Sequence, residues 1–188
     1  MANSSEMLVW IDCEMTGLDA VEDALIEVAV LVTDSELNVM GEGVDVVIKP
    51  SAAAIENMDD FVRNMHTSSG LITELEGGIS MEEATRQVLD YIKEWVPESR
   101  TAPLAGNSVG QDKLFLTRDM PEVMEHLHYR IVDVSSIKEL ARRWYPAAYA
   151  ASPKKTGGHR ALGDIQDSIA ELAYYRGAIM VPAEDANS

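Results

Sequence analysis

Three apolar runs occupy the first part of the chain and alternate with segments rich in turn-forming residues. The runs cover residues 7–12, 25–33 and 44–49 and are rich in Val, Ile and Leu. Runs of this length and composition, bounded by Gly, Asp, Asn and Ser, are typical of β-strands joined by hairpin connections. The pattern therefore predicts an antiparallel meander of three strands.

Apolar residues recur at helical spacing from residue 80 onward. Residues 80–83 have the Ser-x-x-Glu form of a capping box, and the helix that they open is expected to end before Pro97. The apolar face of this helix consists of Ala84, Val88, Ile92 and Trp95. A short strand is expected over residues 101–105. Two helices then follow, one with Asp112 in its first turns and one that runs from Pro121 to about residue 128.

The last third of the chain continues this alternation. Residues 130–134 indicate a fifth strand, and residues 136–139 form a second capping box for a helix that ends before Pro146. A loop over residues 147–158 is expected to be mobile without substrate, and the final helix follows from about Asp164. The order βββαβαβα predicts an α/β protein with a mixed five-stranded sheet and helices on both sides.

Length and composition favour one compact domain. The 188 residues are 46% hydrophobic, so we expect a single domain over residues 1–188, with a core over about 7–180 and short flexible termini. The sequence has no uninterrupted apolar stretch of membrane-spanning length, and residues 1–6 lack the features of a signal peptide. The single cysteine, Cys13, excludes an internal disulfide framework and is expected to fill the core. These features favour a cytoplasmic protein without membrane contact.

The net charge of −17 argues at first against a nucleic-acid ligand, because phosphate-binding surfaces are normally basic. The charge is unevenly distributed. Residues 1–112 carry 22 acidic and 5 basic side chains, whereas residues 113–188 carry 10 of each. Residues 126–160 are locally basic, with 7 basic side chains against 2 acidic ones. This distribution favours a short ligand held by local contacts over an extended polymer.

Four acidic residues and one histidine offer the clearest candidate chemistry. Asp12 and Glu14 lie two residues apart at the end of an apolar run, so in a strand their side chains share one face. Together with Asp112 and Asp164, they could hold two divalent ions about 3.5 to 4 Å apart. His159 could accept a proton from water. Any one of these residues alone is better explained as a solvated surface group, because the chain has 32 acidic residues.

The segments that carry these residues resemble a known enzyme family. Residues 9–18, 106–112 and 159–164 resemble the three motifs of the DEDDh 3′-to-5′ exonucleases, and residues 128–140 extend the likeness toward the oligoribonucleases of that family. Gln111 strengthens this narrower likeness, because other members commonly have an aromatic residue there. The resemblance covers about residues 7–179 and implies a ribonuclease H-like fold.

The resemblance also implies a mechanism. Asp12, Glu14, Asp112 and Asp164 are expected to bind two Mg²⁺ or Mn²⁺ ions, which prefer carboxylate oxygen. His159 is expected to act as the general base. The implied product is a 5′-mononucleotide released from the 3′ end of a short single-stranded RNA of two to five nucleotides.

Further residues match substrate contacts of the oligoribonucleases. Leu18 matches a wedge between bases, and Phe61 stands where the family usually has a stacking Trp. The residues that match the cap over the 5′ phosphate are Ser108, Arg130 and Ser135. Tyr129 matches a residue contributed across a two-fold homodimer, and Gln111 and His66 are further candidate contacts. Structural alternatives remain: core packing for Leu18 and Phe61, helix capping for Ser135, and simple interface packing for Tyr129.

Three functions are compatible with these patterns. The leading one is an exoribonuclease that finishes short oligoribonucleotides, dinucleotides above all. The second is a broader DEDDh exonuclease acting on the 3′ ends of DNA or structured RNA, which activity on chains longer than about five nucleotides would favour. The third is a noncatalytic nucleic-acid or metal-binding module, against which the presence of all five reactive residues argues.

Overall fold

The computed structural model describes residues 4–154 and 158–181. Its elements follow the chain in this order: η1 (Ser4–Glu6), β1 (Leu8–Met15), β2 (Leu25–Thr33), β3 (Val39–Val47), α1 (Ala52–Asn57), α2 (Asp60–Ser68), α3 (Leu71–Glu74), η2 (Leu75–Gly77), α4 (Met81–Trp95), β4 (Pro103–Gly106), α5 (Gly110–Asp119), α6 (Pro121–His126), β5 (His128–Asp133), α7 (Val134–Trp144), α8 (Pro146–Ala150) and α9 (Ala161–Ile179). Within the described residues, no helix is long and apolar enough to cross a membrane.

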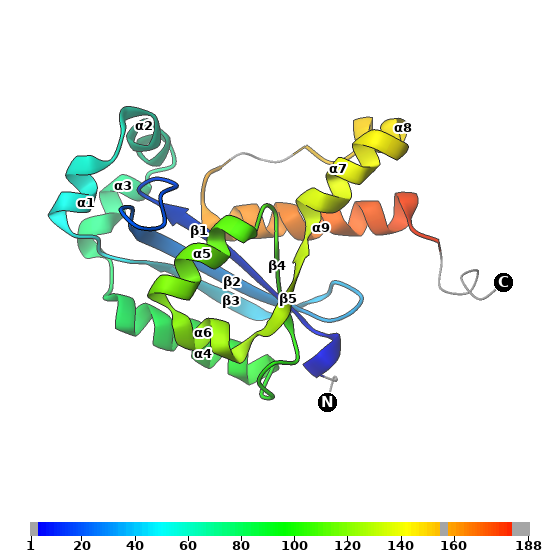
Figure 1. The fold of residues 1–188 in the computed structure, drawn as a ribbon, viewed down its shortest axis with the longest axis horizontal. Coiled ribbons are helices and arrows are strands. Elements are labelled where there is room, and N and C mark those ends of the chain that lie inside the picture. Colours follow the sequence, from blue (N-terminus) through cyan, green and yellow to red (C-terminus); the bar gives the residue numbers. More distant parts are fainter. Residues whose placement is uncertain (1–3, 155–157, 182–188) are drawn as a thin grey trace.

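The five strands form one mixed sheet in the order β3-β2-β1-β4-β5 (Figure 1). The first three strands pair antiparallel, as the hairpin signals predicted. β4 and β5 are parallel to their neighbours, which requires the helical crossovers that precede them. The predicted mixed five-stranded sheet is therefore confirmed, and β1 lies at its centre.

Helices cover both faces of the sheet. Because alternate side chains of β1 point in opposite directions, they pack into both of these helical layers. Val9, Ile11 and Cys13 belong to a core that also contains the buried apolar residues of α4 and α5. On the other face, Trp10 is fully buried against α9 and donates a 2.9 Å hydrogen bond from Nε1 to Oγ1 of Thr33. Asp12 and Glu14 follow Trp10 on the α9 side by the same alternation.

The strongest helical signal is confirmed. Ser80 is the N-cap of α4, and its hydroxyl accepts a hydrogen bond from the amide of Glu83 at 3.2 Å. Ala84, Val88 and Ile92 are buried as predicted, and α4 ends before Pro97. α5 and α6 also begin near the expected residues, with Asp112 in the first turn of α5 and Pro121 at the first position of α6.

The prediction that residues 136–139 cap the next helix was wrong. α7 begins at Val134, and its N-cap is Asp133, whose side chain accepts a 2.9 Å hydrogen bond from the amide of Ser135. Asp133 also accepts a 3.0 Å hydrogen bond from the amide of Ser108. Because one carboxylate oxygen satisfies two amides at the end of β5, the helix begins there and Ser136 lies inside it.

Several short elements were not predicted. α1, α2 and α3 lie between β3 and α4, where Met58, Leu71 and Leu75 pack against Ile26 of β2. β3 begins five residues earlier than expected, and Gly43 there has φ +83°, with the carbonyl oxygen of Val30 only 2.8 Å from the position of a Cβ atom. A side chain would not fit at this bulge.

The expected loop over residues 147–158 begins with α8 instead. Residues 155–157 of that loop lie outside the described part of the chain, as do residues 1–3 and 182–188 of the two termini that we expected to be flexible.

Candidate functional site

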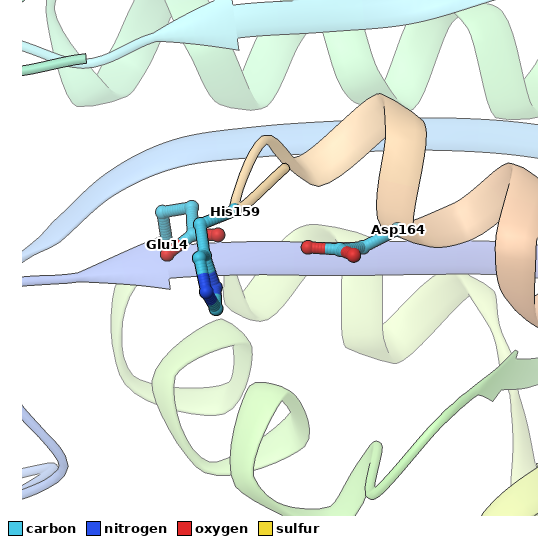
Figure 2. A group of neighbouring side chains, drawn as sticks. All are labelled: Glu14, His159 and Asp164. Carbon is cyan, nitrogen blue, oxygen red and sulfur yellow. The ribbon is translucent and has the colours of Figure 1, made fainter. Parts of the chain in front are cut away.

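Three of the predicted reactive side chains meet at the carboxyl end of β1. Figure 2 shows Glu14 on β1, Asp164 on α9 and His159 on the segment before α9. One potential ligand atom from each lies within 4.8 Å of the other two. Glu14 is buried, Asp164 is half-buried and His159 is exposed. The grouping has the composition of a cation site beside an accessible base.

The other two predicted carboxylates lie at the same end of the sheet. Asp12 precedes Glu14 by two residues on the same face of β1. Asp112 is buried in the first turn of α5, and its Oδ1 accepts a hydrogen bond from the amide of Cys13 at 3.0 Å. This bond holds Asp112 against the backbone between Asp12 and Glu14. The fold thus brings all five predicted reactive residues into one region.

The electrostatics of this region favour cations. Burial raises the pKa of Glu14 to about 8, and the charges of Glu27, Asp164 and Asp112 add to the effect. Burial also raises the pKa of Asp112 to about 6. Without cations, Glu14 therefore holds a proton at neutral pH, as like charges in a poorly solvated site require. A divalent cation would remove this strain by supplying the opposite charge.

The donor set suits hard cations. Carboxylate oxygens from β1, α5 and α9 are the ligands that Mg²⁺ and Mn²⁺ prefer. Cys13, the only cysteine in the sequence, belongs to the core on the opposite face of β1. Burial strongly raises the pKa of its thiol, which keeps it protonated. The site therefore fits oxygen-coordinated ions and not a thiolate-bound metal.

A partly buried group of ion pairs that we did not predict from the sequence anchors the His159 segment. Arg160 donates from Nε to Oε1 of Glu27 at 2.8 Å and from Nη1 to Oε1 of Glu74 at 2.8 Å. The other oxygen of Glu27 accepts the amide of Ala161 at 3.2 Å, which supplies a cap for α9. Glu27 is fully buried and stands directly opposite Glu14 in the pairing of β1 with β2. A lone acid in an otherwise apolar strand was the available sequence signal.

His66 lies behind Glu14 and not on the surface. Its ring is fully buried, with Nε2 2.8 Å from the carbonyl oxygen of Met15 and Nδ1 3.9 Å from Oε2 of Glu14. Burial lowers the pKa of the imidazole. This position does not suit the direct phosphate contact that we considered, but it does support the end of β1.

Leu18 and Phe61 project into solvent across a hollow beside Glu14. They are 75% and 78% exposed, which argues against a core-packing role. With Val62 and Met65, they line a cavity of about 470 Å³ that reaches Glu14, and Phe61 also borders a second hollow of about 350 Å³ next to His159. Gln111 donates a 2.6 Å hydrogen bond to the carbonyl oxygen of Leu18 and so holds the loop in place.

The predicted cap residues are only partly brought together. The hydroxyl oxygens of Ser108 and Ser135 lie 3.1 Å apart, and both amides donate to Asp133. Arg130 and Tyr129 lie further back along β5, where both are exposed, and the guanidinium carbon lies 5.6 Å from the centre of the Tyr129 ring. Asn107 was missed by the sequence reasoning, although it bonds to Ser135.

Comparisons with known proteins agree with this geometry. Residues 9–172 match the family model described as Exonuclease. The chain is 63% identical to an oligoribonuclease of Cutibacterium acnes over 177 residues (94% of this chain, 88% of the relative). It is also 63% identical to an oligoribonuclease of Streptomyces griseus over 184 residues (98% of this chain, 92% of the relative).

Solved structures support the fold. E. coli exonuclease I in complex with a dA16 oligonucleotide aligns with a TM-score of 0.71 at 13% identity, covering 92% of this chain and 41% of that one. The moderately thermophilic exonuclease I from Methylocaldum szegediense aligns with a TM-score of 0.65 at 20% identity, covering 92% of this chain and 41% of that one. The chain spans about two fifths of the length of these structures, and the likeness concerns the fold alone.

Proposed function

The chain belongs to the exonuclease family, within which it groups with the oligoribonucleases, and we propose that it removes 5′-mononucleotides from the 3′ end of short oligoribonucleotides, dinucleotides above all. The observation that carries this proposal is the meeting of Glu14, His159 and Asp164 within 4.8 Å beside a solvent-open hollow. Carboxylates beside an accessible imidazole are the groups that phosphodiester hydrolysis requires.

Four carboxylates hold the cofactor in this proposal, namely Asp12, Glu14, Asp112 and Asp164. When bound there, two divalent ions, Mg²⁺ or Mn²⁺, would lower the pKa of a water molecule and would neutralise charge on the scissile phosphate. The residues on β1 and α5 are fixed by buried backbone, since Asp112 is tied to the amide of Cys13. That rigidity keeps the phosphate in one position during attack.

His159 takes the proton from the attacking water. Its exposure leaves the ring accessible to solvent, and the bonds from Arg160 to Glu27 and Glu74 hold the following residue against the sheet. The backbone of His159 has φ +47°, which is uncommon for a residue with a side chain. This conformation is kept by the anchored residue beside it and aims the segment toward Glu14.

Leu18 and Phe61 hold the bases of the substrate. Both side chains are exposed on the walls of the hollow that reaches Glu14. An aromatic face stacks with any base, so this contact does not select a sequence. Phe offers less area than the Trp usual in the family, which weakens stacking without removing it.

Ser108, Ser135 and Arg130 close the site around the 5′ phosphate of the substrate. Arg130 offers a fork of donors that suits a terminal phosphate. A cap at this position excludes chains that continue in the 5′ direction, which restricts substrates to about two to five nucleotides.

The protein acts as a homodimer in which Tyr129 reaches the partner's site. β5 and α7 present a group of exposed apolar and aromatic side chains, namely Tyr129, Ile131, Leu140 and Trp144. Exposed apolar and aromatic side chains on neighbouring elements favour association. We also propose a cytoplasmic location, where short RNA fragments arise during RNA decay.

The direct test is a time course with 5′-labelled RNAs of two, three, five and ten nucleotides, in Mg²⁺, in Mn²⁺ and with a chelator. We expect fast cleavage of the dinucleotide that depends on the metal, and slow attack on the ten-mer. Matched DNA oligonucleotides serve as the control for sugar preference. Equal or faster cleavage of the ten-mer would instead favour a broader exonuclease acting on DNA or structured RNA.

A further inference from the structure

A buried polar network lies behind the two cap serines. The side-chain amide of Asn107 donates from Nδ2 to Oγ of Ser168 at 2.8 Å and to Oε2 of Glu171 at 3.2 Å. The other oxygen of Glu171 lies 2.8 Å from the ammonium nitrogen of Lys138 on α7. Glu171 is only 1% exposed. The network therefore links α9 and α7 to the segment that follows β4.

This network fixes the orientation of the Asn107 amide. Ser168 already donates its hydroxyl hydrogen to the carbonyl oxygen of Asp164 at 2.8 Å, so its oxygen can only accept from Asn107. The carboxylate of Glu171, paired with Lys138, also only accepts. Both partners on this side therefore require the NH₂ group of Asn107, and its carbonyl oxygen must face Ser135.

The orientation of Asn107 in turn sets the direction of the serine hydroxyls. Ser135 donates its hydroxyl hydrogen to Oδ1 of Asn107 at 3.0 Å. Since Ser135 has a single hydrogen to donate, the 3.1 Å contact between the two hydroxyls must run from Ser108 to Ser135. The backbone amides of both serines are already bound to Asp133. The hydroxyl of Ser108 is thus the one hydrogen of this serine pair that can turn toward an incoming anion without breaking a buried bond.

We propose that Glu171, acting through Asn107, is a positioning residue that makes Ser108, and not Ser135, the hydroxyl donor to the substrate's 5′ phosphate. This inference deepens the proposed function and rests on its cap. The phosphate preference of the enzyme is then set from α9, the helix that also carries Asp164. α9 therefore carries both a catalytic carboxylate, Asp164, and the residue that directs the cap, Glu171.

The test compares kcat/KM for two dinucleotides that differ only in carrying a 5′ phosphate or a 5′ hydroxyl. We expect Ser108→Ala to lower the phosphate preference about tenfold, as the loss of one hydrogen bond to a charged group does, mainly through KM. Ser135→Ala should change the preference by less than about twofold, because its hydrogen is committed to Asn107. Equal losses in the two variants would overturn the proposal.

Glu171→Gln sharpens the test because it should reverse the direction of the hydrogen bonds between residue 171, Asn107 and Ser135. Lys138 only donates, so the glutamine oxygen faces Lys138 and its NH₂ faces Asn107. The Asn107 amide then flips and donates to Ser135, while the Ser168 hydroxyl turns from the carbonyl oxygen of Asp164 to the Asn107 oxygen. The flip frees the hydroxyl hydrogen of Ser135 for the phosphate. In this background Ser135→Ala should lower the phosphate preference several-fold, and the absence of this coupling would contradict the proposed relay.

Two controls separate the possible failures. Arg176→Gln changes another residue of α9, one that contacts Ser35 and Glu36, and should leave both rates unchanged. A wild-type enzyme without any preference for the 5′ phosphate would remove the cap from the proposed function and the relay with it. A normal wild-type preference that falls equally in both serine variants would overturn the relay alone. Because that comparison leaves Glu171 unchanged, it remains decisive even if Glu171→Gln fails to fold.

Discussion

Two polar regions of the molecule differ in how their charged groups are neutralised. One is the carboxylate end of β1, and the other is the serine cap, which consists of Ser108 and Ser135 with the residues that hold them. At the carboxylate end, like charges crowd together and the pKa of Glu14 rises to about 8. At the cap, Asp133 accepts two amides, and Glu171 is paired with Lys138 while it accepts from Asn107. The carboxylate end of β1 therefore needs an added positive charge, whereas the carboxylates at the cap already have partners within the protein.

This difference indicates two kinds of preparation for one substrate. A site that must bind cations keeps carboxylates close together, although their repulsion lowers the stability of the metal-free protein. Bound ions then offset this repulsion. A site that must recognise a terminal phosphate benefits from donors whose directions are fixed in advance. The carboxylate end should therefore respond strongly to metal and pH, and the cap should respond to substrate structure.

The largest expected effect is the loss of activity in Asp112→Asn. Removing this carboxylate weakens the cation site, and we expect hydrolysis of a dinucleotide to fall on the order of 10³-fold, since several kcal/mol of charge stabilisation are at stake. Asp90→Asn, on the surface of α4, is the matched control and should keep full activity. Unchanged phosphodiester hydrolysis in Asp112→Asn would show that the two-metal assignment is wrong.

A smaller effect is expected for His159→Ala. Loss of a general base typically lowers the rate by about 10²-fold or more. The variant should still bind Mn²⁺, because the carboxylates that would hold the ions are unchanged, so the loss should appear in kcat. A variant that keeps the wild-type rate while binding Mn²⁺ normally would exclude His159 as the base.

Phe61 lies between the hollows beside Glu14 and His159, so its replacement sharpens the distinction between chemistry and recognition. Phe61→Ala should raise KM for a dinucleotide about tenfold with little change in kcat, as expected when one stacking contact is lost. Phe61→Trp should lower KM by adding aromatic area. If kcat falls instead and KM stays constant, Phe61 acts on the catalytic geometry and not on base binding.

The smallest effect concerns stability without metal. The pKa of Glu14 is about 8 in the folded protein and about 4.5 ordinarily, so between these values the folded state holds a proton that the unfolded state has lost. Stability should therefore fall as pH rises from about 4.5 to 8. Glu14→Gln should raise the metal-free Tm by a few degrees at pH 8 and leave it nearly unchanged at pH 4.5. A lower Tm at pH 8 would contradict the assigned repulsion.

Much of the fold follows from sequence patterns, with instructive exceptions. α4 was predictable because its capping box and four apolar side chains agree with one another. α1, α2 and α3 were not, because they are short, α1 has no buried residue, and α2 and α3 each bury one side chain. The cap of α7 was misassigned because Asp133 gains a partner, Ser108, that is 25 residues away in sequence.

The site shows a similar division. The five reactive residues could be selected from their types, spacing and family resemblance, and the fold gathers them at one end of β1. The residues that hold them in place could not be selected from the sequence. Glu27 binds Arg160, which is 133 residues away in sequence, and Asn107 binds Glu171, which is 64 residues away. Such pairs become visible only when the sheet register and the position of α9 are known.

The most direct test of this account is calorimetric titration of Mn²⁺ into the metal-free protein at pH 7, in two buffers with different heats of ionisation. We predict that two ions bind per chain and that binding releases protons, because Glu14 with a pKa of about 8 is protonated before the ions arrive. Glu14→Gln should reduce the number of protons released. Binding without proton release, or release that is unchanged in Glu14→Gln, would contradict the assignment of this end of β1 as a strained cation site.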